Sequence, residues 1–213
     1  MSSFGIYGII ELILSIIFLL IQAHFIIDKE YRKFISYRLM FLIGICETYL
    51  IIGTGILPFL KNIGILGHWS EKLTGAIYEA AFDTLFIMNL ALALNRLFAM
   101  QVNMAESKFE LFIYKCLFVF FALIFASIAA LFMSPYCGLY IDEKFNCFRY
   151  DQNTSFSMHF YHIEVYEYLS LTIACFLIYC AVNQPKMSIN FNTINQNRKS
   201  MEMRILIQSF VQY

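Results

Sequence analysis

The chain has 213 residues, of which 60% are hydrophobic, 18% aromatic and only 14% charged. Soluble domains average about 45–50% apolar and about 25% charged residues, so this chain has too few charges to cover a water-exposed surface. Fifteen basic and fifteen acidic residues give a net charge of zero, which leaves no basic excess for binding nucleic acid. The composition excludes a disordered chain and a disulfide-dense scaffold, and it predicts a protein surrounded by membrane lipid.

Five apolar segments are long enough to cross a membrane as helices. A hydrocarbon core about 30 Å thick needs roughly 20 apolar residues in a helix. None of the segments alternates like a barrel strand, and backbone groups in lipid must be satisfied within their own segment. The predicted fold class is therefore all-α, a polytopic membrane helix bundle forming a single domain. The expected spans are about 4–27, 39–60, 73–100, 111–133 and 165–182.

A sixth apolar run begins at Ile205 and reaches the last residue, Tyr213. Nine helical residues extend roughly 13 Å, less than half of the hydrocarbon thickness. We therefore expect 205–213 to be the start of a sixth span in a C-terminally truncated sequence. The first span has no basic segment before it and no cleavage site after it, so we expect it to remain as a helix and not to be removed as a signal peptide.

The distribution of basic residues predicts the orientation, because cytoplasmic connectors carry an excess of Lys and Arg. With the N-terminus outside, eleven basic residues face the cytoplasm and four face outward. This predicts a multi-pass plasma-membrane protein with an extracellular N-terminus. The sequon at Asn153, a candidate glycosylation site, falls in the predicted outer loop and agrees. The cytoplasmic set is Lys29, Arg32, Lys33, Arg38, Arg96, Lys108, Lys115, Lys186, Arg198, Lys199 and Arg204; the outer set is Lys61, Lys72, Lys144 and Arg149.

The longest outer connector, about 134–164, contains Cys137 and Cys147. The outside of the cell is oxidising, so a disulfide between them is one expectation and two free thiols the other. The remaining cysteines lie within spans and are expected to be small apolar packing residues.

Four carboxylates are candidate ligand-binding residues. Glu79 and Asp83 lie four residues apart in the third span, so they share one helical face. Glu164 and Glu167 lie at the outer mouth of the fifth span. Ionisable groups in membrane helices face the bundle interior or a water-filled cavity, which predicts an outer cavity for a cationic or hydrogen-bonding ligand. The alternative is a set of helix-end carboxylates at the level of the lipid headgroups.

No catalytic or metal-binding motif is present. His159 and His162 are spaced as a pair beside Glu164, but no third distant His or Cys cluster accompanies them. The chain has no H-E-x-x-H, no G-x-S-x-G and no phosphate-binding glycine loop. We therefore expect no catalytic residues, no metal, no cofactor and no enzyme activity.

Four short segments carry more specific patterns. They read YRLMFLIGI at 37–45, LALNRLFA at 92–99, CFRYD at 147–151 and E-x-R-x-x-IQS at 202–209. Together with the outside N-terminus and the two-cysteine outer loop, they resemble the nematode serpentine chemoreceptor superfamily of rhodopsin-type seven-transmembrane receptors, in its classes T, X or V. The resemblance implies a rhodopsin-like helix order and a G-protein-coupled receptor that detects small environmental molecules in an outward-facing pocket.

The same resemblance implies roles for two further residues and for the partners. Asn95 and Arg96 would be the switch position at the G-protein face, with Asn95 in place of the usual acid. The partners would be a small-molecule ligand, membrane lipid and, in a completed chain, a heterotrimeric G protein. The residues 69–76 lack the cysteine that usually tethers the second outer loop in the family.

The alternatives to a receptor function are a small multispan transporter or channel component and a membrane scaffold without a ligand.

Overall fold

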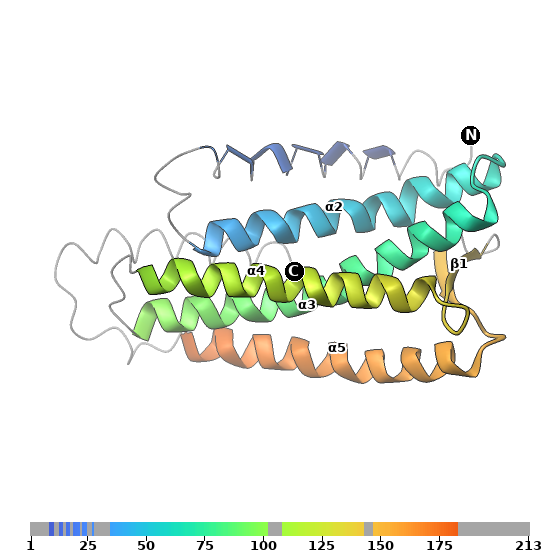
Figure 1. The fold of residues 1–213 in the computed structure, drawn as a ribbon. Helices are drawn as coiled ribbons and strands as arrows, with labels where there is room; N and C mark the ends of the chain where they lie inside the picture. The colour runs from blue at the N-terminus through green and yellow to red at the C-terminus, as the bar shows by residue number, and fades with distance from the viewer. Residues whose placement is uncertain are drawn as a thin grey trace.

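The computed structural model describes residues 35–101, 108–142 and 147–182, together with scattered positions between 9 and 27. The described chain is mostly helical, and its long helices run up and down past one another with a small hairpin at one end of the bundle (Figure 1). The elements in chain order are α2 (Ile35–Asn62), α3 (His68–Gln101), α4 (Lys108–Met133), β1 (Leu139–Asp142), β2 (Cys147–Tyr150) and α5 (Ser155–Val182).

Three helices in the described part of the chain are long and apolar enough to cross a membrane. Their candidate spans are Ser36–Asn62, His68–Asn95 and Phe112–Met133, which correspond to the second, third and fourth predicted spans. The expectation of a helical membrane bundle is thus confirmed at this level, with three such helices where five complete spans were expected. Of the predicted first span only scattered positions are described, and these are helical; the partial sixth span at 205–213 lies outside the described residues.

The fifth predicted span, 165–182, lies entirely within α5, but the helix begins ten residues earlier than expected, at Ser155. The predicted outer connector 134–164 is therefore not a plain loop. It consists of the hairpin followed by the first turns of α5. This early start matters for function, because it places Glu164 inside a regular helix and not at a frayed end.

Helix α3 lies at the centre of the described bundle and packs against α2, α4 and α5. Toward the end of the bundle away from the hairpin, an apolar core joins α2, α3 and α4. Other apolar side chains of α4 and α5 are exposed, as lipid-facing residues are expected to be. The core side chains are Leu39 and Ile43 from α2, Met88 and Leu92 from α3, and Phe121 from α4.

The hairpin covers one end of the bundle and is tied to it by polar contacts. The Lys61 ammonium forms an ion pair with Glu71 at 2.6 Å and donates a hydrogen bond to the carbonyl oxygen of Ile141 at 2.7 Å. The same Glu71 carboxylate accepts the backbone N–H of Ile141 at 2.6 Å. Because this partly buried ion pair provides partners for both the N–H and the carbonyl of Ile141, the end of α2 and the start of α3 fix the position of β1.

A glycine lets the hairpin approach α3 closely. A Cβ atom at Gly75 would lie 2.8 Å from the carbonyl oxygen of Leu139 and 3.0 Å from the Leu139 Cβ. Real Cβ atoms do not come this near to a backbone oxygen, so a side chain here would push β1 away from the helix.

We expect Gly75→Ala to lower the free energy of unfolding by about 1–3 kcal/mol, because overpacking at this contact outweighs the gain in helix propensity. The thermal midpoint of the purified chain in detergent measures the change. Gly67→Ala is the matched control, because its Cβ would meet no atom nearer than 3.9 Å. Equal midpoints for the two variants would contradict the close approach of β1 to α3.

Candidate functional site

Three carboxylates come together between α3 and α5, close to the hairpin. Glu79 and Asp83 lie one turn apart on α3, and Glu164 reaches them from α5. One oxygen from each lies within 4.8 Å of the other two. Glu79 and Glu164 are each only 3% exposed. We call these three residues the acid triad; three of the four carboxylates singled out from the sequence belong to it.

Two tyrosine hydroxyls contact the acid triad. The Tyr150 hydroxyl, from β2, lies 2.5 Å from the Glu79 Oε1 atom and also contacts the Oε2 atom of Glu164. The Tyr168 hydroxyl, from α5, donates to the Oδ1 atom of Asp83 at 2.5 Å. A phenol carries one proton, so Tyr150 can donate to only one of its two carboxyl neighbours at a time. The second contact requires another proton or a cation.

In the absence of a bound cation, burial favours the neutral forms of Tyr150 and Glu164. Burial, reinforced by the charges of Glu79 and Glu164, raises the pKa of the Tyr150 hydroxyl, so it remains a donor. Burial and the adjacent Glu79 carboxyl likewise raise the pKa of Glu164, which lies just before the predicted fifth span.

Ion pairs do not balance the charges of the acid triad in the part of the chain that the structure describes. Within the described ranges, no ion pair joins any of its three carboxylates to a basic side chain. The Oε1 atom of Glu164 is buried and has no hydrogen-bond partner there. Carboxylates this close together repel one another when ionised, so the cluster must either take up protons or bind a compensating positive charge.

Aromatic rings pack beside the acid triad. The Tyr168 ring stacks on Phe86 with centroids 4.5 Å apart and meets the edge of Phe82 at 4.9 Å. Closer to the hairpin, Tyr78 packs on Phe148 at 4.7 Å. These rings give the carboxylates apolar neighbours, and ring faces attract a cation through the cation–π interaction.

The sequence analysis did not single out the tyrosines. One signal was available for Tyr168, which follows Glu164 by four residues and so shares its face of α5. Tyr150 belongs to the CFRYD segment at 147–151, where it was read only as part of a family pattern. Nothing in the local sequence shows that its ring turns toward α3.

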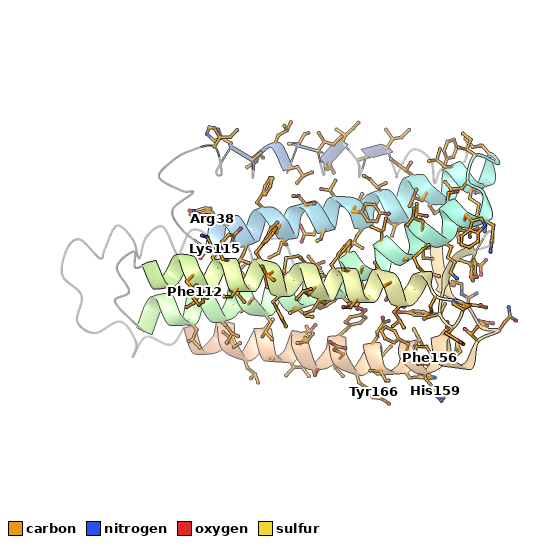
Figure 2. The ribbon with its side chains drawn as sticks, viewed as in Figure 1. Arg38, Phe112, Lys115, Phe156, His159 and Tyr166 are labelled. Carbon is orange, nitrogen blue, oxygen red and sulfur yellow. The ribbon has the colours of Figure 1, made fainter. Side chains whose placement is uncertain are left out.

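Other predicted residues lie away from the acid triad. Glu167 is exposed on α5 and is not one of the three carboxylates that the structure brings together, so its place in the ligand-binding set stays a prediction. His159 and His162 are also exposed, and Figure 2 shows His159 on the outer side of α5, pointing away from the bundle. Asn153 is exposed beyond β2, where a sequon would be accessible.

Of the two alternatives for Cys137 and Cys147, a disulfide or two free thiols, the structure shows the free thiols. Both thiols are free, and the hairpin register pairs Cys147 with Asp142 while Leu139 pairs with Tyr150. Cys137 therefore lies near the opposite end of the hairpin from Cys147. At about 3.4 Å per strand residue, their Cα atoms are further apart than the roughly 7 Å that a disulfide spans. Cys137 instead contacts the Ser157 hydroxyl at 3.5 Å.

The end of the bundle away from the hairpin contains the predicted switch position. The Asn95 side-chain amide donates to the Ser36 hydroxyl at 2.9 Å, which ties the last turns of α3 to the start of α2. Arg96 follows in α3, and its side chain lies outside the described atoms. Arg38 and Lys115 lie at this same end (Figure 2), as the predicted cytoplasmic side requires.

Comparison of the chain with known protein families, with curated proteins and with solved structures found no match. The structure by itself defines a mostly helical protein with three candidate membrane spans and a buried cluster of carboxyls and tyrosines at one end.

We expect Tyr150→Phe to lower the free energy of unfolding by about 1–3 kcal/mol, because buried carboxyl oxygens lose their donor. Thermal unfolding of the purified chain in detergent measures the loss. Tyr136→Phe is the control, since it removes the same hydroxyl from a residue that is 71% exposed. Equal stability of the two variants would show that the Tyr150 hydroxyl does not hold the cluster together.

Proposed function

We propose that this chain is a multi-pass plasma-membrane receptor similar to the nematode serpentine chemoreceptors, and not an enzyme. It binds a small environmental molecule in a pocket near its outer surface and, in a completed receptor, acts on a heterotrimeric G protein at its cytoplasmic face. The observation that carries the proposal is the acid triad, because two buried carboxylates and a third, partly buried one without a basic partner in the described chain are costly in a structural core.

The chemistry of the acid triad favours a cationic ligand. A protonated amine brings the positive charge that the carboxylates lack, and it donates hydrogen bonds that they accept. The neighbouring rings of Phe82, Phe86 and Tyr168 offer an apolar and cation-attracting wall for the rest of such a molecule. The ligand class we propose is therefore a small organic amine.

The helix arrangement supports the receptor part of the proposal. Helix α3 is central and packs against three neighbours, as expected for a rhodopsin-like order. Its outer half contributes Glu79 and Asp83, while its other end contributes Asn95 and Arg96. A single rigid helix thus connects the proposed ligand site to the proposed G-protein face.

The ligand site is tested by thermal stabilisation of the purified chain with a panel of alkylamines and arylamines, against neutral molecules of the same shape. We expect at least one amine to stabilise the chain against thermal unfolding. We expect Asp83→Asn and Glu79→Gln to weaken the binding of that amine at least tenfold. Glu167→Gln, which removes the same charge from an exposed position, leaves binding unchanged. The proposal fails if no amine stabilises the chain or if all three variants behave alike. Amines that bind should also accelerate nucleotide exchange by a G-protein heterotrimer in membranes that hold a completed receptor containing this chain.

The proposed orientation is tested separately at Asn153. Expression in a cell that attaches N-linked glycans should add one glycan, seen as a mobility shift that a glycosidase reverses. Asn153→Gln abolishes the shift, because Asn153 is the acceptor of the only sequon in the chain. An N-terminal tag that antibodies reach only after permeabilisation would reverse the assignment.

A further inference from the structure

We propose that the acid triad binds a divalent cation of the Ca²⁺ type. This inference rests on the geometry of Glu79, Asp83 and Glu164 and holds whether or not the chain is a receptor. It assigns to these carboxylates an inorganic occupant that would compete with an amine for the same oxygens, in a cluster for which the sequence predicted no metal.

The donor set fits an oxygen-preferring ion. All three side chains are carboxylates, and hard cations such as Ca²⁺ prefer oxygen, whereas zinc and copper favour His and Cys. Two oxygens bound to one Ca²⁺ at about 2.4 Å lie at most about 4.8 Å apart. One oxygen from each member of the triad already lies within 4.8 Å of the others, so one ion reaches all three with only small movements of the side chains.

A second observation points to a missing partner. The Oε1 atom of Glu164 is buried and has no hydrogen-bond partner among the described residues, although the residue is only 3% exposed. A buried acceptor without a donor costs about 1–3 kcal/mol and more when it is charged. A cation in the triad would give this oxygen a ligand without adding another side chain.

The surrounding hydrogen bonds also suit a metal site. Metal-ligating carboxylates are commonly held in place by donors outside the ligand set. Here Tyr168 donates to Asp83, and the Tyr150 hydroxyl contacts both Glu79 and Glu164. A divalent ion would neutralise two of the three negative charges, and the tyrosine donors would stabilise the remaining one.

The affinity should be modest. The protein supplies three ligands, whereas Ca²⁺ takes six to eight oxygens, so waters or backbone carbonyls must complete the shell. Sites of this kind on extracellular modules have dissociation constants on the order of 0.1–1 mM. Such an affinity matches an outward-facing site.

The experiment uses the full chain in detergent near neutral pH, with Tb³⁺ as a luminescent substitute for Ca²⁺. Emission excited through the nearby rings of Tyr150 and Tyr168 should saturate, and Ca²⁺ should displace the probe, whereas K⁺ at equal ionic strength should not. We expect Asp83→Asn and Glu164→Gln to weaken Ca²⁺ binding at least tenfold. Glu167→Gln is the matched control on the exposed side of α5 and should bind as the unmodified chain does.

Three results would overturn the proposal. The first is a lack of saturable Ca²⁺ binding, which would leave protons as the compensating charge. The second is equal Ca²⁺ binding by Glu164→Gln and Glu167→Gln, which would place the ion on detergent or on surface carboxylates. The third is displacement of Tb³⁺ by K⁺. If Glu164→Gln fails to fold, Glu164→Asp keeps the charge but shortens the side chain, and should also weaken Ca²⁺ binding.

Ca²⁺ binding without amine binding would refute the receptor proposal alone, and amine binding without Ca²⁺ binding would refute the cation site alone.

Discussion

The contact between the Tyr150 hydroxyl and two buried carboxyls is the constraint on which this end of the molecule depends. It joins β2 to Glu79 of α3 and to Glu164 of α5. Helix α5 packs chiefly on α3 and β2, so these polar contacts fix its position together with the Phe82, Phe86 and Tyr168 rings. A hydrogen bond of this kind is directional, and it therefore specifies the rotation of α5 more sharply than apolar contact alone.

The cost of this arrangement is the reason to assign it a function. Carboxyls buried side by side oppose one another and oppose burial itself. An apolar set of side chains of the same shape would pack at least as well, as replacements of buried ion clusters show in other proteins. The other buried acid at this end, Glu71, has both Lys61 and a backbone N–H as partners. Glu164 lacks such a basic partner in the described chain, which sets the acid triad apart from a structural ion pair.

Much of the helical fold could be predicted from the sequence, because span length and apolar content are local properties. The helices α2, α3 and α4 extend a few residues beyond the spans predicted at 39–60, 73–100 and 111–133. The reason is that polar residues at the membrane surface continue a helix without adding to its apolar run. The shared face of Glu79 and Asp83 also follows from helical spacing alone.

The remainder of the site depends on contacts between distant segments. The hairpin at 139–150 is short and mixes polar with aromatic residues, so the sequence shows only a connector. Its register separates Cys137 from Cys147, and a cysteine count does not reveal register. The meeting of Tyr150 with Glu79 joins residues 71 positions apart. No periodicity along one segment encodes a contact of that range.

The bridge made by Lys61 has a mechanical consequence. Its ammonium holds the first turn of α3 through Glu71 and the backbone of β1 through Ile141, and β1 is hydrogen-bonded to the strand that ends in Tyr150. Sliding of α2 along α3 would therefore pull the hairpin with it and shift the phenol relative to its carboxyl neighbours. A ligand bound at the acid triad would therefore be coupled to the relative height of α2 and α3, so that a change in either would alter the other.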